Sequence, residues 1–137
     1  MSSRWFAWGE RTYIMGIVNV TDDSFSGDGR PEHILAIARA HEQLFLGSDM
    51  LDIGGESTRP GHKQIDEAIE IARVVPAIRA ARALLPAAPI SIDTYKPAVA
   101  RAAHEAGADL VNSVWGCSGE LLETVAELDM PLVAMHN

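Results

Sequence analysis

The sequence lacks features that define several classes of protein. Cys117 is its only cysteine, so no disulfide can form within the chain, and a reducing cytoplasm is the expected location. No apolar run approaches the roughly 20 residues of a membrane-spanning helix, and residues 1–11 hold no signal-peptide core. These absences exclude a disulfide-stapled scaffold and predict no membrane partner.

Positive charge is also scarce. The 11 Lys and Arg residues are outnumbered by 19 Asp and Glu, which gives a formal net charge of −8 and an isoelectric point near 5.0. Such an acidic chain disfavours nucleic acid as a partner. An anionic small-molecule substrate would therefore have to be held by local groups. The hydrophobic share of 47% and the length of 137 residues suit one compact domain.

Short apolar runs alternate with segments of helical periodicity along the chain. The runs predict strands at residues 13–20, 49–53, 89–92, 110–112 and 132–135. The periodic segments predict helices at residues 34–45, 65–78, 98–106 and 121–128. We expect Gly47 and Gly107 to end two of these helices and Pro76 to kink another. Alternation of this kind predicts parallel βαβ units.

Five polar residues stand at the predicted carboxyl ends of the strands. They are Asn19, Asp52, Asp93, Asn112 and His136. The segment 47–52 also echoes the segment 107–112, which suggests repeated units of a barrel or of a doubly wound sheet. In a (β/α)8 barrel the strand ends converge on one mouth, which would explain five short polar side chains in corresponding places. We therefore favour the barrel.

The stretch that follows the second predicted strand is rich in groups that bind anions. Residues 53–61 read Ile-Gly-Gly-Glu-Ser-Thr-Arg-Pro-Gly. The glycine pair lets the backbone turn sharply or approach a ligand. Ser57, Thr58 and Arg59 then place two hydroxyls and a guanidinium in one loop, which suits a phosphate or a carboxylate.

Two of these stretches resemble the loops of one enzyme family. Residues 14–29, Ile-Met-Gly-Ile-Val-Asn-Val-Thr-Asp-Asp-Ser-Phe-Ser-Gly-Asp-Gly, resemble the first loop of dihydropteroate synthase, and residues 52–61 resemble its second loop. The similarity extends over nearly the whole chain. It implies a TIM barrel of which this chain supplies about the first five strands and four helices, as the N-terminal part of a pterin-binding domain. It also implies a transferase of folate synthesis that joins 4-aminobenzoate to a dihydropterin methyl diphosphate and releases diphosphate.

The same resemblance assigns roles to individual residues. It places pterin binding on Asp93 and Asn112. An acceptor-only carboxylate and a mixed amide together suit the donor and acceptor edge of a pterin. It implies contacts to the diphosphate or the aminobenzoate for residues of the two loops, namely Ser57, Thr58, Arg59 and Phe25. It implies that Asn19 binds Mg²⁺, and that the protein forms a homodimer, as barrels of this family commonly do. No catalytic residue is assigned.

Some positions depart from the family pattern. Asp22 stands where the family usually has Pro, Gly27-Asp28-Gly29 replaces Asp-Gly-Gly, and Ser113 follows Asn112 in place of Asp. A closed barrel of this kind needs about 200 residues or more, and this sequence has 137. The family's later pterin-binding residues therefore have no counterpart in it. Two alternatives therefore stay open: a related pterin-binding methyltransferase, and a non-catalytic pterin-binding or assembly fragment.

Overall fold

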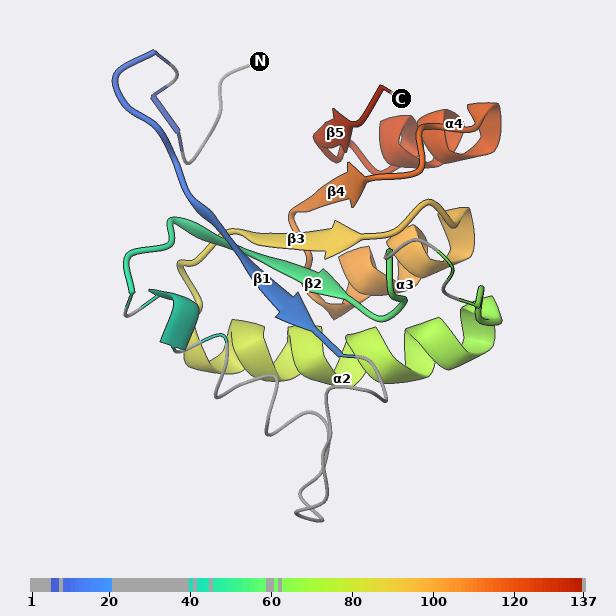
Figure 1. Ribbon diagram of the computed structural model, residues 1–137, viewed down its shortest axis with the longest axis horizontal. Coiled ribbons are helices and arrows are strands. Elements are labelled where there is room, and N and C mark those ends of the chain that lie inside the picture. Colours follow the sequence, from blue (N-terminus) through green and yellow to red (C-terminus); the bar gives the residue numbers. More distant parts are fainter. Residues whose placement is uncertain are drawn as a thin grey trace.

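A computed structural model describes residues 6–7, 9–20, 40, 42–44, 46–58, 61 and 63–136. Within these residues the chain forms one parallel sheet with helices packed against it (Figure 1). The strands are β1 (Met15–Asn19), β2 (Met50–Gly54), β3 (Ile90–Asp93), β4 (Leu110–Ser113) and β5 (Leu132–Ala134). The helices are α2 (Glu67–Leu84), α3 (Pro97–Ala106) and α4 (Gly119–Glu127).

The strand order distinguishes between the two architectures that the sequence left open. The strands lie side by side in the order β1-β2-β3-β4-β5, and all four pairings are parallel. Each crossover therefore moves one strand further in the same direction. A doubly wound sheet would reverse direction at a switch point and carry helices on both faces. Sequential winding is the arrangement of a (β/α)8 barrel, so the predicted fold class is confirmed.

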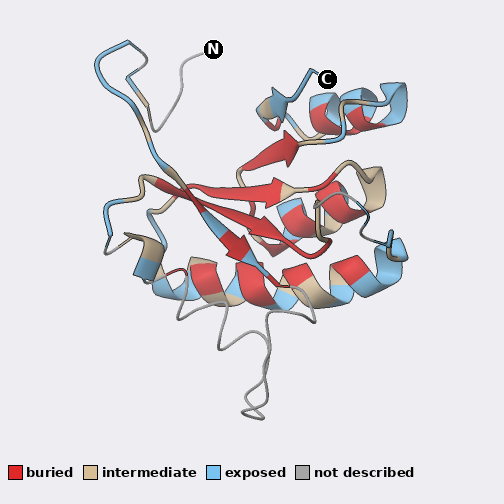
Figure 2. Cartoon of the chain, viewed as in Figure 1, coloured by how far each residue is buried: buried red, intermediate tan, exposed pale blue. Residues whose placement is uncertain are grey.

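One face of the sheet forms the hydrophobic core with the helices. Alternate strand residues point to this face, and they are almost completely buried: Val18, Leu51, Ile53, Ile90, Ile92 and Val111. Val74 and Ile78 of α2 and Val99 of α3 meet them in one cluster. Figure 2 shows the buried sides of α2 and α3 turned toward the strands. The opposite face of the sheet is therefore the one available for a site.

The helix boundaries follow from their local sequence. The Asp66 side chain accepts a hydrogen bond from the Ala68 backbone N–H at 2.9 Å and so caps α2. The helix continues through Pro76 to Leu84, and the kink expected at Pro76 stays a prediction. Pro97 is the first residue of α3, and Gly107 ends that helix with a φ of 113°, as predicted.

The internal sequence echo corresponds to one structural device used twice. Asp49 donates its backbone N–H to the Ile14 carbonyl at 2.8 Å and accepts the Ile14 N–H on its carboxylate at 2.8 Å. Asp109 makes the same pair of bonds with Ile90, at 2.7 Å and 2.9 Å. Each carboxylate also binds an arginine, Arg11 for Asp49 and Arg82 for Asp109. The echo therefore reports how neighbouring strands are joined at their amino ends, far from the carboxyl ends.

Two predictions about the chain meet the limits of the described residues. The helix predicted at residues 34–45 falls largely outside them, although residues 40 and 42–44 are helical. The end expected at Gly47 agrees with its φ of 100°. Across the part of the chain that the structure describes, no helix is long and apolar enough to cross a membrane.

Candidate functional site

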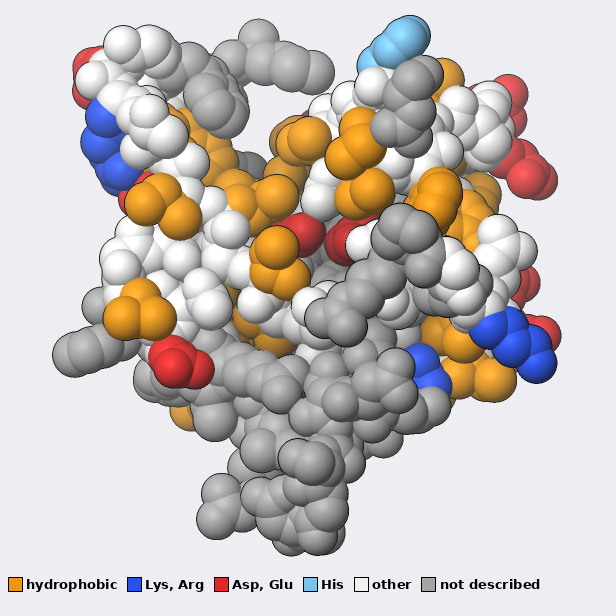
Figure 3. All heavy atoms as spheres, in the orientation of Figure 1, with side chains coloured by type: hydrophobic (Ala, Val, Ile, Leu, Met, Phe, Trp, Pro, Cys, Tyr) orange, Lys and Arg blue, Asp and Glu red, His pale blue; other side chains and the backbone are white. Residues whose placement is uncertain are grey.

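The carboxyl ends of four strands bring three predicted site residues into one row. The ladder register pairs Asn19 with Gly54, Gly54 with Asp93, and Asp93 with Asn112. Because these residues are in register, their side chains share one face, the face opposite the hydrophobic core. Figure 3 shows acidic side chains in a hollow near the centre of the molecule, among hydrophobic ones. Asn19, Asp93 and Asn112 thus form a polar surface at the carboxyl ends of the strands, which we call the floor of the site.

Two of the five expected strand-end residues lie elsewhere. Asp52 is the third residue of β2 and pairs with Ser91, so it lies one level below the row. His136 follows β5 and is exposed, while Val133 occupies the place beside Asn112. The expectation of five corresponding strand ends was therefore wrong for these two. Strand β2 continues past Asp52 to Gly54, and β5 ends at Ala134 before His136, so the end of an apolar run does not mark the end of the strand.

Asp52 supports the row from below. The Asn112 side-chain amide donates to Asp52 Oδ2 at 2.9 Å, and both residues are buried. Burial raises the pKa of Asp52, while the nearby Ser91 hydroxyl and the Asn112 amide lower it. Asp52 Oδ1 and Ser91 Oγ themselves lack a partner of hydrogen-bonding geometry among the described residues. Since a carboxylate only accepts, the contact orients the Asn112 amide with its nitrogen toward Asp52.

Asp93 is the carboxyl group of the row, and its pKa is strongly shifted. Burial is the largest cause, followed by the negative charges of Asp52, Glu70 and Glu56, and together they raise the pKa of Asp93 to about 7. Its usual value is 3.8. A carboxyl group with such a pKa changes charge near neutral pH, and a ligand that donates hydrogen bonds to it stabilises its ionised form. The structure therefore places at the mouth a group poised to accept N–H donors.

The loop after β2 is held tightly against α2. The Arg73 guanidinium donates to the Gly55 carbonyl at 3.0 Å, and the backbone of Gly55 lies directly on the helix. Ser57 and Thr58 follow, and both are half-buried. Arg59 and Phe25, which the sequence also proposed for this site, lie outside the described residues. Of the loop donors, the structure thus positions the two hydroxyl residues.

A cation would find suitable oxygen atoms beside Gly54. A Cβ built on Gly54 would lie 3.6 Å from Asp93 Oδ2 and 3.9 Å from Asn19 Oδ1, in ordinary contact with both oxygens, so the glycine keeps the space beside them free of side-chain atoms. Among the described residues there is no cluster of three or more His, Cys, Asp or Glu side chains that could hold a metal by themselves. One or two protein oxygens suit Mg²⁺, which takes most of its ligands from water and phosphates.

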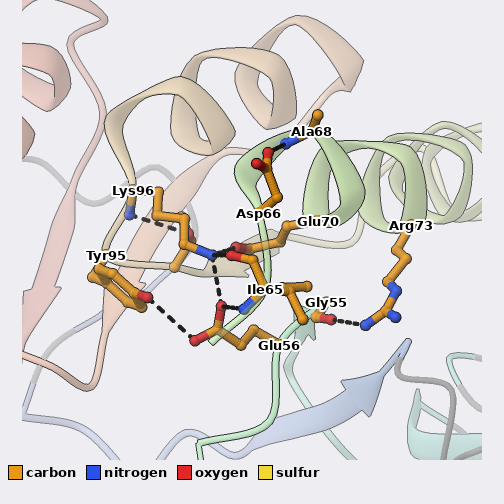
Figure 4. Close-up of polar contacts among 10 residues, drawn as sticks. Gly55, Glu56, Ile65, Asp66, Ala68, Glu70, Arg73, Tyr95 and Lys96 are labelled. Carbon is orange, nitrogen blue, oxygen red and sulfur yellow. Dashed lines mark hydrogen bonds and ion pairs between the residues drawn. The ribbon is translucent and has the colours of Figure 1, made fainter. Parts of the chain in front are cut away.

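The sequence alone missed the group that anchors this loop. Lys96 lies between Glu56 and Glu70, and Tyr95 binds Glu56 from the other side (Figure 4). The Ser91 hydroxyl, which lies beside Asp52 one level below the row, was also missed. Its signal was present, because Ser91 and Asp93 alternate with Ile90 and Ile92 in a period of two. No comparable local signal marks the ion pairs.

Adding one methyl group at Gly55 is expected to destabilise the fold. A Cβ at this position would lie 2.8 Å from Val74 Cγ1 and 3.1 Å from Glu70 Cγ. The loop or the helix must then move, so we expect Gly55→Ala to lower the free energy of unfolding by about 1–3 kcal/mol in denaturant titrations. Gly119→Ala is the matched control. A Cβ there meets nothing within 4 Å, and an unchanged or slightly raised stability is expected. A Gly55→Ala variant as stable as the Gly119→Ala variant would contradict the close packing at Gly55.

Comparisons with known sequences give a consistent match. The family model described as "Pterin binding enzyme" matches residues 15–137. A dihydropteroate synthase from Clostridium beijerinckii is 46% identical over 140 residues, which is 100% of this chain and 52% of that protein. A dihydropteroate synthase from Streptococcus pyogenes is 49% identical over 127 residues, covering 90% of this chain and 47% of that protein. The chain thus spans about half the length of these relatives.

Solved structures agree with this match. The dihydropteroate synthase of Clostridium difficile, solved in the presence of pteroic acid, has a TM-score of 0.91 and 44% identity over 96% of this chain and 51% of its own. That of Xanthomonas albilineans, solved with 4-aminobenzoic acid, has a TM-score of 0.88 and 44% identity over 93% of this chain and 47% of its own. These neighbours are TIM barrels, and the chain matches about half of each.

Proposed function

The chain belongs to the pterin-binding enzyme family, and on that premise we propose that it carries the pterin-binding floor and second loop of a dihydropteroate synthase. The reaction would condense a dihydropterin methyl diphosphate with 4-aminobenzoate and release diphosphate. One observation carries the proposal: the register that brings Asn19, Asp93 and Asn112 together beside the loop of Ser57 and Thr58. Residues 1–137 would be one part of the barrel domain.

Pterin recognition would fall to Asp93 and Asn112. A pterin offers N–H donors and ring-nitrogen acceptors along one flat edge. The Asp93 carboxylate accepts from the donors, while the Asn112 amide, held by Asp52 at 2.9 Å, presents its oxygen and its second N–H in a fixed orientation. Because these groups are buried or half-buried, a flat molecule without that edge would leave them unpaired, which disfavours it.

The diphosphate would lie between the row and the second loop. We place it near the hydroxyls of Ser57 and Thr58, which donate hydrogen bonds to phosphate oxygens. Asn19 would contribute an amide oxygen to Mg²⁺, which supplies charge neutralisation as the carbon–oxygen bond to the diphosphate breaks. Arg59 and Phe25 complete the proposal from the sequence alone, as contacts for the diphosphate or the aminobenzoate. The cytoplasmic location is proposed from the sequence, and the homodimer from the resemblance to the family.

The alternative within the same fold is a pterin-binding methyltransferase. It would use a methylated folate and would have no use for hydroxyl donors at the place of a diphosphate. The loop of Glu56, Ser57 and Thr58 therefore favours the synthase. A non-catalytic pterin-binding fragment would bind the pterin but release no diphosphate, so the two possibilities differ in a measurable product.

The test is product formation by the protein as its own cell makes it. We expect diphosphate release and dihydropteroate formation that require both substrates and Mg²⁺. Asn19→Ala should raise the Mg²⁺ concentration needed for half-maximal rate by tenfold or more, because a protein oxygen would be lost from the metal. Pterin binding without turnover would support the binding fragment, and methyl transfer from a folate would support the methyltransferase. An unchanged Mg²⁺ requirement would remove Asn19 from the metal site.

A further inference from the structure

Three charged side chains outside the floor meet below the second loop. Lys96 comes from the turn before α3, Glu56 from the loop after β2, and Glu70 from the first turns of α2 (Figure 4). The Lys96 ammonium lies 2.6 Å from Glu56 Oε2 and 2.7 Å from Glu70 Oε2. The exposed fractions of the three side chains are only 12%, 5% and 1% in this order. A charged cluster buried to this degree joins three separate elements.

The Lys96 ammonium has all its protons engaged within the protein. Besides the two carboxylates, it donates to the Ile65 carbonyl at 2.7 Å. An ammonium has three donors, so none is left for a bound phosphate. Burial on its own would lower the pKa of Lys96, but the hydrogen bonds to Glu56 and Glu70 raise it above its usual value. The lysine therefore stays charged and acts on the protein rather than on an anionic ligand.

The same contacts close the base of the second loop. Glu56 Oε2 accepts the Ile65 backbone N–H at 3.1 Å, while Lys96 binds the Ile65 carbonyl. Glu56 and Ile65 are nine positions apart, and Ser57 and Thr58 lie directly after Glu56. The Tyr95 hydroxyl also donates to Glu56 Oε1 at 3.2 Å. Glu56 is thus fixed on both of its oxygens, and so is the start of the segment that carries the hydroxyls.

We propose that Lys96 is a positioning residue that holds the Ser57–Thr58 segment in place for the diphosphate through Glu56 and Ile65. This inference rests on the proposed function, because it requires a diphosphate at that segment. It differs from a purely structural role in one respect. Loss of the lysine should weaken the recognition of the diphosphate and leave the recognition of the pterin ring, on the separate floor of Asp93 and Asn112, nearly unchanged.

The experiment compares two ligands, the dihydropterin methyl diphosphate and the same pterin with a hydroxymethyl group in place of the diphosphate ester. Their dissociation constants are measured by calorimetry on the protein as its own cell makes it. For Lys96→Met we expect the preference for the diphosphate ligand to fall at least tenfold, with affinity for the hydroxymethyl pterin within about threefold of the parent. Lys63→Met is the matched control. It removes an equal charge from an exposed position of the same loop and should leave the preference unchanged.

Lys96→Met leaves two buried carboxylates without their cation and can fail to fold. Glu56→Gln is then the deciding variant, because Lys96 keeps Glu70 as a one-to-one partner while the ion pair at the base of the loop is lost. The same selective loss is expected. A parent protein that binds neither pterin would overturn the proposed function. A parent that prefers the diphosphate, with variants that keep this preference or lose both ligands equally, would overturn the positioning role alone.

Discussion

Replacing Asp93 with Asn is expected to stabilise the folded chain near neutral pH and, in the same protein, to remove most of its pterin affinity. Burial, and then the charges of Asp52, Glu70 and Glu56, raise the pKa of Asp93 from 3.8 to about 7. Between about pH 4 and pH 7 the folded chain therefore keeps a proton at Asp93 that the unfolded chain has released. The free energy of unfolding falls as the pH rises through this window.

Asn at this position has the same shape and carries no charge. We expect a gain in the free energy of unfolding on the order of 2–4 kcal/mol at about pH 8, which disappears below about pH 4, where the carboxyl is protonated in both states. Thermal or denaturant unfolding measured across this range checks both the size and the pH dependence. Asp129→Asn, at an exposed turn, is the control and should change neither. A destabilised Asp93→Asn at pH 8 would contradict the buried-charge argument.

The effect of Asp93→Asn on binding should have the opposite sign. In the proposed pterin site the N–H donors of the ligand would face an acceptor at position 93, and an amide would put an N–H against them or offer a single oxygen. We expect affinity for a pterin without a diphosphate, measured in the absence of Mg²⁺, to fall tenfold or more. Affinity of the parent should rise as the pH passes through about 7, because the ionised carboxylate is the better acceptor, and the variant should show no such rise. A site that holds a destabilising group in order to bind its ligand is an ordinary trade-off between stability and function.

The general architecture could be derived from the sequence because its signals are local. Apolar runs and helical periodicity located all five strands and the helices that follow β2, β3 and β4, and Gly107 ended α3 as expected. The polar residues Asn19, Asp93 and Asn112 were placed at one mouth, and the register brings them into one row. Local sequence suffices for such features because each depends on a few neighbouring residues.

The rest depends on contacts between distant parts of the chain. Asp52 was expected at a strand end, but β2 continues to Gly54, so Asp52 lies one level lower, where it supports Asn112 from 60 positions away. Lys96 meets Glu70 and Glu56 across 26 and 40 positions. A charged residue in a loop usually faces water, so only the packing of α2 against the two loops reveals that these three are buried together.

The contact between Asn112 and Asp52 permits a test in which the shape of the site is kept constant. Asn112→Asp would set a second carboxylate at the 2.9 Å separation that now joins an amide nitrogen to Asp52 Oδ2. Two buried negative charges at this distance cannot both be paired. We expect Asn112→Asp to lower the free energy of unfolding by about 3–5 kcal/mol at about pH 8. The loss should be smaller at about pH 5, where one carboxyl can keep a proton and donate it to the other.

Exchanging the two side chains separates their contribution to folding from their contribution to binding. The double variant Asp52→Asn with Asn112→Asp again has one amide and one carboxylate at the same two places, so a hydrogen bond can form in the reverse direction. Most of the lost stability should therefore return in denaturant titrations. Pterin affinity should not return, because position 112 would present only acceptors to a ligand edge that needs both a donor and an acceptor.

The two outcomes depend on different observations and can fail separately. An Asn112→Asp variant as stable as the parent at about pH 8 would mean that Asp52 and Asn112 are not in buried contact. An exchanged pair that regains stability and also binds the pterin as the parent does would leave the contact intact and remove Asn112 from ligand recognition. If stability returns without affinity, the hydrogen bond to Asp52 serves to orient an Asn112 amide that binds the ligand. The fold then needs a hydrogen bond between positions 52 and 112 in either direction, whereas ligand binding needs the donor at position 112.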